Sequence, residues 1–153
     1  MSFSNWVSWS KKASLAGIEY PGVYCIAISD SSLDGVEFSW FKDIAYIGMT
    51  NSIKGLAGRL RQFERTLHGS SGHGGADRVR YVHSDFEVLA PRLYVSVQPI
   101  HCNSKDPKAI DYRAMGRVAQ LEYDCFASYF EAYGRLPPFN DQKNAPKASK
   151  HGR

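Results

Sequence analysis

The chain has 153 residues, of which 43% are hydrophobic and 13% aromatic, and its net charge is +4. This length fits one domain, and so many apolar side chains can bury a core, which excludes intrinsic disorder for the body of the chain. No apolar run reaches the roughly 18 residues that a membrane span needs, and the first residues lack the order of a secretory signal, so we expect a cytosolic protein.

The first half of the chain predicts two paired strands. Residues 4–15 begin with Ser-Asn and carry two tryptophans three positions apart, which predicts a short amphipathic helix. Residues 22–29 and 44–50 are rich in β-branched side chains and apolar at almost every position. They predict a long-looped antiparallel hairpin, with residues 30–43 as its polar connection and other layers packed on both faces.

The second half predicts helices before and after a third strand. Residues 55–67 repeat a leucine or phenylalanine every three or four positions, which predicts an amphipathic helix. After a glycine-rich break, residues 77–83 predict a short helix, residues 92–100 a strand ended by a proline, and residues 108–133 a long helix closed by Gly134. The expected fold class is α+β, with a small three-stranded, mainly antiparallel sheet flanked by helices.

The charged residues are unevenly distributed. Residues 19–43 carry five acids and one base, whereas residues 54–80 carry six bases and two acids. Residues 141–153 are basic and lack large apolar side chains, so we expect a disordered tail after a single domain over residues 1–140. Clustered Lys and Arg suit a polyanion such as DNA, and a mixed solvated surface is the alternative. The side chains expected to contact nucleic-acid phosphates are Lys54, Arg61, Arg65, Arg78 and Arg80.

Cysteine and histidine form no recognisable metal or disulfide pattern. Cys25, Cys102 and Cys125 are odd in number and have no CxxC spacing, so we expect three reduced thiols. The five histidines are scattered, which argues against a structural zinc site.

One carboxylate breaks the pattern of the long helix. At about 100° per residue, Glu122 falls in the same stripe as Val118, Cys125 and Phe126. An ionised carboxylate in an apolar stripe costs several kcal/mol unless it is paired or holds a cation. The sequence therefore leaves two interpretations open, a buried salt bridge or a metal ligand.

Three further side chains sit at unusual places. Arg59 borders the apolar stripe of its helix, so its stem can pack while its guanidinium either reaches a cleft or extends to solvent without a partner. Period-two alternation places Tyr24 and Tyr46 on one face of the predicted hairpin, where each could also be an ordinary core residue. Gly48 leaves that face bare beside Tyr46, where a ligand backbone could approach.

In order along the chain, these residues spell Gly-Val-Tyr at 22–24, Tyr-Ile-Gly at 46–48, then Arg59, Glu122 and Asn140. This arrangement resembles the GIY-YIG nuclease superfamily, from Gly22 to Asn140. The closing segment, Tyr-Gly-Arg-Leu-Pro-Pro-Phe-Asn at residues 133–140, resembles the stand-alone, restriction-type members in particular.

The resemblance implies a metal-dependent endonuclease that hydrolyses DNA phosphodiesters. Glu122 would be the one protein ligand of a Mg²⁺ or Mn²⁺ ion, and either Tyr24 or Tyr46 would take the proton from the attacking water. Arg59 would donate to the phosphate as charge grows on it, and Asn140 would order the water or a phosphate oxygen near the metal. A homodimer would supply the two active sites that a palindromic double-strand cut needs.

The chain also departs from the superfamily pattern. Met49 stands where many members have lysine, Phe63 stands where members often have tyrosine or histidine, and the loop over residues 50–54 is enlarged. Lys54, His68 or His73 could supply the missing polar group, and His73 is the one that we place in the catalytic set. Two alternatives follow: a catalytically impaired nucleic-acid-binding module of the same fold, or an unrelated α+β interaction domain in which Glu122 is merely paired.

Overall fold

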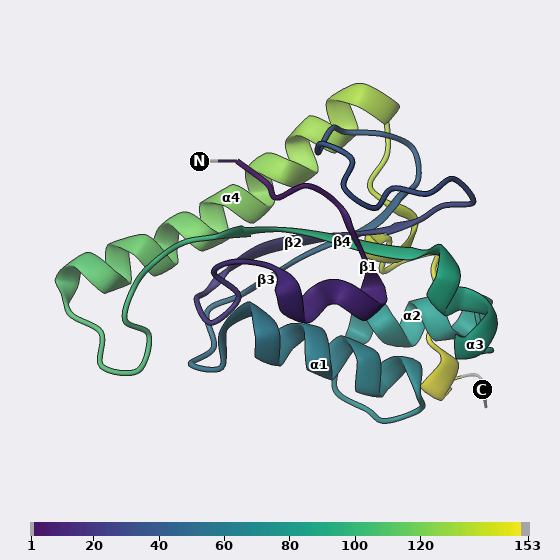
Figure 1. The fold of residues 1–153 in the computed structure, drawn as a ribbon, viewed down its shortest axis with the longest axis horizontal. Coiled ribbons are helices and arrows are strands. Elements are labelled where there is room, and N and C mark those ends of the chain that lie inside the picture. Colours follow the sequence, from purple (N-terminus) through teal and green to yellow (C-terminus); the bar gives the residue numbers. More distant parts are fainter. Residues whose placement is uncertain (1, 151–153) are drawn as a thin grey trace.

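The computed structural model describes residues 2–150, in which an antiparallel sheet lies between two layers of helices (Figure 1). The strand order is β1-β4-β2-β3. The strands are β1 (Val7–Ser8), β2 (Gly22–Ile28), β3 (Ile44–Thr50) and β4 (Leu93–Pro99).

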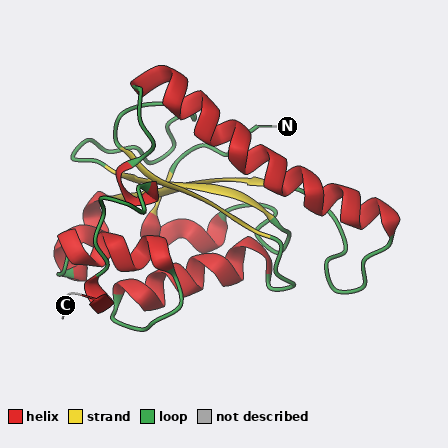
Figure 2. Ribbon diagram, turned by 180° about the vertical axis from the view of Figure 1, so that it is seen from behind, coloured by secondary structure: helices red, strands yellow, loops and turns green. Residues whose placement is uncertain are grey.

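The helices divide between the two faces of the sheet. Figure 2 shows the longest helix, α4, on one side and the other helices on the opposite side. The α-helices are α1 (Gly55–Leu67), α2 (Gly74–Val82), α3 (Phe86–Leu89) and α4 (Ala109–Tyr133). Short 3-10 helices cover Trp9–Ser14, Ala90–Arg92, Pro138–Asn140 and Ala148–Lys150. No helix within residues 2–150 is long and apolar enough to cross a bilayer.

The central strand, β2, contributes to a core on each face. Tyr24 and Ile26 pack with the side chains of α1, whereas Val23 and Cys25 pack with those of α4. This confirms the expectation of layers on both faces, and it explains why β2 is apolar at every position. The antiparallel hairpin of β2 and β3 is also confirmed, with Tyr24 paired to Gly48 and Ile26 to Tyr46.

The α+β class is confirmed, but the sheet has four strands rather than three, because the first part of the predicted helix over residues 4–15 is extended and only Trp9–Ser14 is helical, as a 3-10 helix. The backbone N–H of Ser4 donates to the carbonyl of Val97 at 2.8 Å, and β1 continues this pairing along the outer edge of β4. Trp6 and Trp9 enter the cores on opposite faces of the sheet. Covering an open strand edge outweighs the weak helical preference of this segment.

Residues 141–150 follow a defined course, which differs from the disordered tail that the sequence suggests. The backbone N–H and the hydroxyl of Ser149 both donate to Asp77 on α2, at 3.0 and 2.5 Å. Arg78 donates to the carbonyl of Ala145 at 3.2 Å, and Ala148 is fully buried. The segment lacks large apolar side chains, and these polar contacts hold it to α2 instead. Residues 151–153 lie outside the described part of the chain.

Candidate active site

The two tyrosines of the motif lie side by side on the α1 face of the hairpin. Their ring centroids are 6.1 Å apart. Tyr24 is fully buried, whereas Tyr46 is half-buried. The exposure difference distinguishes two residues that the sequence alone leaves equivalent, because only Tyr46 presents surface to solvent.

Two glycines make room for these rings. A Cβ atom at Gly48 would collide with the hydroxyl and Cζ of Tyr24 and with the ring of Tyr46. A Cβ atom at Gly75 of α2 would collide with the opposite edge of the Tyr46 ring. Tyr46 is thus held between β3 and α2. The sequence points to Gly48 by its place in the motif, but nothing local points to Gly75, since its role depends on the packing of α2.

His73 reaches the tyrosines from the loop before α2. Its Nε2 lies 2.6 Å from the hydroxyl of Tyr24, and its Nδ1 accepts the backbone N–H of Ala76 at 3.2 Å as the N-cap of α2. The side chain is 1% exposed. Of the three candidates for the missing polar group, His73 is the one that touches a motif tyrosine.

The other two candidates lie elsewhere. His68 is exposed and stacks on Phe86 with ring centroids 4.2 Å apart. Lys54 is exposed at the start of α1. Phe63 fills the position four residues after Arg59, and its ring centroid lies 4.8 Å from that of His73. An apolar ring and an imidazole from another element therefore share the space beside the tyrosines.

Arg59 extends from α1 toward the same group. Its Nη1 donates to Oε1 of Gln62 at 2.5 Å, and its positive charge acts on Tyr24, Tyr46 and Glu122. Gln62 in turn donates from Nε2 to the carbonyl of Gly72 at 2.8 Å, next to His73. Gln62 was not expected from the sequence, although its position three residues after Arg59 on one helix is a detectable spacing.

Glu122 of α4 completes the group. Its carboxylate is half-buried, at the border of the apolar stripe rather than in its middle, and it has no salt-bridge partner within residues 2–150. Burial raises the pKa of Glu122, and the charge of Arg59 opposes this rise. The buried salt bridge that was one interpretation of this residue is therefore not formed.

The donor set fits a weakly held Mg²⁺ and no metal that needs a protein cage. Among residues 2–150, no three side chains of His, Cys, Asp or Glu are grouped to hold a metal. Mg²⁺ commonly uses one or two carboxylates, keeps several waters and accepts phosphate oxygens from a substrate. The unpaired carboxylate of Glu122, whose charge acts on both tyrosines and is opposed by that of Arg59, offers such a ligand.

The ionisation of the site is dominated by burial. Burial raises the pKa of Tyr24 well above its usual value, with Tyr46 as the next contribution in the same direction. Burial also raises the pKa of Tyr46, while the charges of Arg59 and Arg78 lower it. Burial, together with the charge of Arg59, lowers the pKa of His73 to about 3. At neutral pH the imidazole and both phenols are therefore uncharged.

Asn140 lies beside this group but uses its amide differently from the role that the resemblance implies. Its Oδ1 accepts the backbone N–H of Ile47, and its Nδ2 donates to the carbonyl of the same residue, each at 2.8 Å. In this arrangement both polar atoms of the amide bind the backbone of β3.

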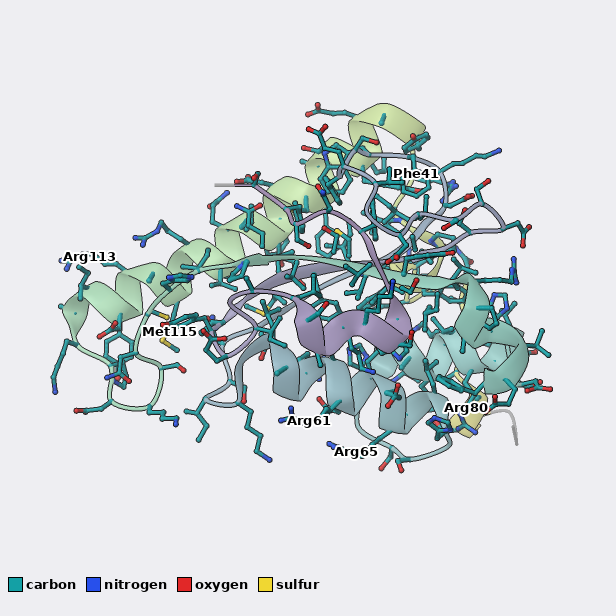
Figure 3. All side chains as sticks on the ribbon, viewed as in Figure 1. Phe41, Arg61, Arg65, Arg80, Arg113 and Met115 are labelled. Atoms are coloured by element: carbon teal, nitrogen blue, oxygen red, sulfur yellow. The ribbon has the colours of Figure 1, made fainter. Side chains whose placement is uncertain are left out.

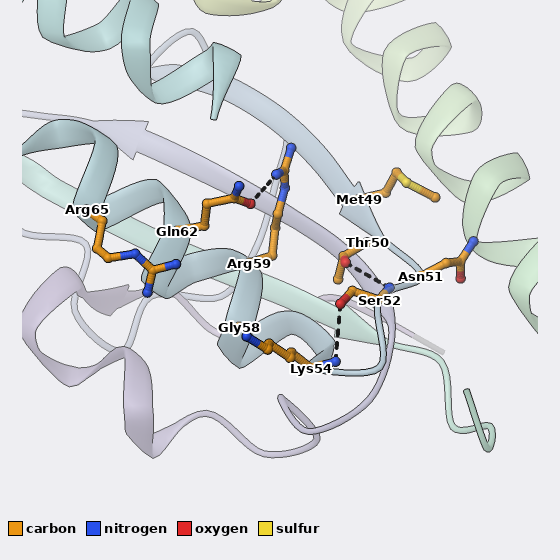
Figure 4. Close-up of a pocket in the computed structure, with 9 residues that line it drawn as sticks. All are labelled: Met49, Thr50, Asn51, Ser52, Lys54, Gly58, Arg59, Gln62 and Arg65. Carbon is orange, nitrogen blue, oxygen red and sulfur yellow. Dashed lines mark hydrogen bonds between the residues drawn. The ribbon is translucent and has the colours of Figure 1, made fainter. Parts of the chain in front are cut away.

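A cationic pocket of about 490 Å³ adjoins Arg59 (Figure 4). Arg59 lies between Arg65 on one side and the enlarged loop after β3 on the other. None of the described residues around it is acidic, so a negatively charged group there would meet three cationic side chains and no carboxylate. The residues that line it are Met49, Thr50, Asn51, Ser52, Lys54, Gly58, Arg59, Gln62 and Arg65.

The five basic residues expected at phosphates do not share one location. Lys54 and Arg65 line the cationic pocket, and Arg78 is near enough to Tyr46 to lower its pKa. Arg61 points away from α1 beside another pocket that includes Glu64 (Figure 3). Arg80 contacts Asp77 at 3.5 Å with its side chain only 16% exposed, so it faces the protein rather than solvent.

No protein-family model matches the chain, and neither curated proteins nor solved structures give a significant match. The resemblance to the GIY-YIG superfamily is therefore a hypothesis that depends on the residues and geometry described above.

Proposed function

We propose that the protein is a metal-dependent DNA endonuclease that hydrolyses phosphodiester bonds. The observation that supports this most is that two phenols lie side by side, Tyr24 and Tyr46, within electrostatic reach of a guanidinium and an unpaired carboxylate from two other elements, Arg59 and Glu122. Such a set combines a proton acceptor, a donor to a developing phosphate charge and a cation ligand, which are the groups that hydrolysis of a phosphodiester needs.

In this proposal Tyr46 first gives its own proton to solvent and then, as the phenolate, accepts the proton of the attacking water. Its half-buried ring presents surface to solvent, whereas Tyr24 is fully buried with its hydroxyl on His73. The charges of Arg59 and Arg78 favour the phenolate of Tyr46. A divalent cation on Glu122 would offset the carboxylate charge, which raises the pKa of Tyr46, and would polarise the phosphate.

Arg59 binds the scissile phosphate, and the cationic pocket takes the neighbouring part of the DNA backbone. The guanidinium lines the pocket and also acts on both phenols, so one phosphate can meet Arg59 while the next lies near Lys54 or Arg65. Phosphate contacts of this kind give affinity and register without reading bases.

The test is cleavage of supercoiled plasmid with Mg²⁺ or Mn²⁺. We expect nicking by the wild-type protein and a loss of at least about 100-fold in Glu122→Gln, Arg59→Ala and Tyr46→Phe. Glu131→Gln removes an exposed carboxylate from the same helix and should cleave like the wild type. Cleavage that survives Glu122→Gln would refute the proposed metal ligand.

A second candidate is a nucleic-acid-binding module without chemistry. Phe63 and Met49 favour it, because apolar side chains occupy two positions where members of the superfamily often have polar ones. This candidate predicts salt-sensitive retention of DNA with no cleavage under any divalent ion. If the protein neither retains nor cleaves DNA, the remaining interpretation is an unrelated interaction domain.

A further inference from the structure

We propose a directed chain of contacts from His73 through Tyr24 to Tyr46, in which His73 donates a hydrogen bond to Tyr24 and the ring of Tyr24 lies against that of Tyr46. His73 is then a positioning residue that acts through Tyr24, and it does not itself take a proton from water. The catalytic consequence of this chain rests on the proposed function, but the direction of its hydrogen bond does not.

The first step is the tautomer of His73. A backbone N–H can only donate, so Nδ1 of His73, which lies 3.2 Å from the N–H of Ala76, must accept and carry no proton. The ring is neutral, because burial and Arg59 lower its pKa to about 3. The single ring proton is therefore on Nε2.

The second step is the direction of the contact with Tyr24. Protonated Nε2 can only donate, so the hydroxyl oxygen of Tyr24 accepts this hydrogen bond of 2.6 Å. The positive charge of Arg59 also favours the phenolate of Tyr24. Because Nε2 of His73 donates, the hydroxyl proton of Tyr24 points away from His73.

The third step is the contact between the two phenols. Tyr24 is fully buried, and the neighbouring phenol is Tyr46 at 6.1 Å between ring centroids. The chain thus ends on the one of the two phenols that faces solvent.

The position of His73 at the start of α2 explains how an imidazole can reach Tyr24 although Phe63 occupies the neighbouring place on α1. The imidazole comes from the N-cap of α2, and its ring packs against Phe63 at 4.8 Å between centroids. Gln62 bonds Arg59 with one end of its amide and the carbonyl of Gly72 with the other. The side chain of Gln62 therefore positions both the guanidinium of Arg59 and the loop that carries His73.

The decisive measurement is ¹⁵N NMR of the histidine-labelled full chain, without DNA or metal. We expect one histidine in the neutral Nε2–H form from pH 5 to pH 8, and its signal should disappear in His73→Gln. A protonated ring at pH 6, or the Nδ1–H tautomer, would overturn the inference. Because this experiment involves no cleavage, it separates the failure of the chain from the failure of the nuclease proposal.

Variants test the function of the chain. His73→Leu removes the donor, whereas His73→Gln keeps an N–H near the place of Nε2. We expect kcat to fall about 10-fold to 100-fold in His73→Leu, with KM unchanged. In His73→Gln we expect kcat to recover at least in part. The double variant of His73→Leu with Tyr24→Phe should cost no more than Tyr24→Phe alone. Equal losses in both His73 variants, or fully additive losses in the double variant, would contradict the chain. If the wild type cleaves no DNA, the NMR result still decides the direction of the bond between His73 and Tyr24.

Discussion

Asn140 and Ile47 are joined by two hydrogen bonds, in which the side-chain amide of Asn140 pairs with the N–H and the carbonyl of Ile47, each at 2.8 Å. β3 is an edge strand, so these backbone groups have no neighbouring strand to bond. The amide takes the place of that missing strand. Since Ile47 follows Tyr46 directly, Asn140 fixes the segment of β3 that carries the proposed base.

The first prediction concerns this pair. Asn140→Ala leaves the N–H and the carbonyl of Ile47 without their partner and should lower the free energy of unfolding by about 1–3 kcal/mol. Asn140→Asp should be destabilising as well, because its carboxylate would face the carbonyl of Ile47. Urea unfolding followed by circular dichroism measures the loss. Asn144→Ala, which removes an exposed amide near the same turn, should cost less than about 1 kcal/mol. Unchanged stability in Asn140→Ala would exclude the strand-like role.

The second prediction concerns the glycines beside the phenols. Gly48→Ala and Gly75→Ala each place a methyl group against a buried tyrosine ring, so both should be destabilising by about 1–3 kcal/mol and should displace Tyr46. Thermal unfolding and cleavage assays measure the two effects. Gly116→Ala is the control, because nothing lies within 4 Å of a Cβ atom at that helical position. It should be neutral or stabilising by about 0.5–1 kcal/mol.

The third prediction concerns acid stability. The pKa of His73 is lowered to about 3 in the folded protein, so between that value and the pKa of an unfolded histidine near 6.5 the unfolded chain binds a proton that the folded chain does not. Above about pH 6.5 His73 therefore does not affect the pH dependence of stability. As the pH drops through this window, the free energy of unfolding falls by about 1.4 kcal/mol per pH unit.

Denaturant unfolding at several pH values measures this slope. The difference between the wild type and His73→Gln isolates the histidine, since Glu122, whose pKa is raised by burial, contributes in the opposite sense to both proteins. His101→Gln removes an exposed histidine, leaves His73 in place and should retain the slope. An identical pH dependence in the wild type and His73→Gln would show that the imidazole is not held neutral.

The fourth prediction concerns the cationic pocket. Lys54→Gln and Arg65→Gln should weaken DNA binding for all sequences alike, and each should reduce the slope of log K against log salt by about 0.9. Fluorescence anisotropy with a duplex, in the Glu122→Gln background so that no cleavage occurs, gives the slope. Arg113→Gln is the matched control, since Arg113 is an exposed arginine of α4 on the other side of the sheet (Figure 3). A slope that falls equally in Arg113→Gln would point to a diffuse positive surface instead of the pocket.

The fifth prediction concerns residues 145–150, which fasten α2. Burial opposes the ionisation of Asp77, but the hydrogen bonds from Ser149 and the charge of Arg80 lower its pKa overall. A chain that ends at Asn144 loses these bonds and the contact of Arg78, and should unfold more easily by at least about 2 kcal/mol. Hydrogen exchange over residues 74–82 should rise in parallel. A chain that ends at Lys150 should behave like the full protein; equal exchange in both truncations would show that the segment does not hold α2.

Local sequence patterns predict the main elements correctly. The period of the leucines in α1, the two-sided apolar strands β2 and β3, and the left-handed Gly134 that ends α4 all express preferences of neighbouring residues. The common face of Tyr24 and Tyr46 also follows from strand alternation once the two strands pair. Residues 4–8, the first part of the predicted helix, fail the same kind of argument because their partner is β4, about 90 positions away in the chain.

By itself, the sequence determined the class of fold, the paired strands and the presence of a carboxylate within the apolar stripe of the long helix. Only the tertiary structure decided that Glu122 is unpaired, that Asn140 binds the backbone of β3, and that His73 reaches Tyr24. Each of these depends on residues separated by dozens of positions, as in the 49 between Tyr24 and His73 and the 93 between Ile47 and Asn140. Periodicity acts over a few residues, whereas the partner of a polar group is set by how whole elements pack, and that packing is where the chemistry of this chain is assembled.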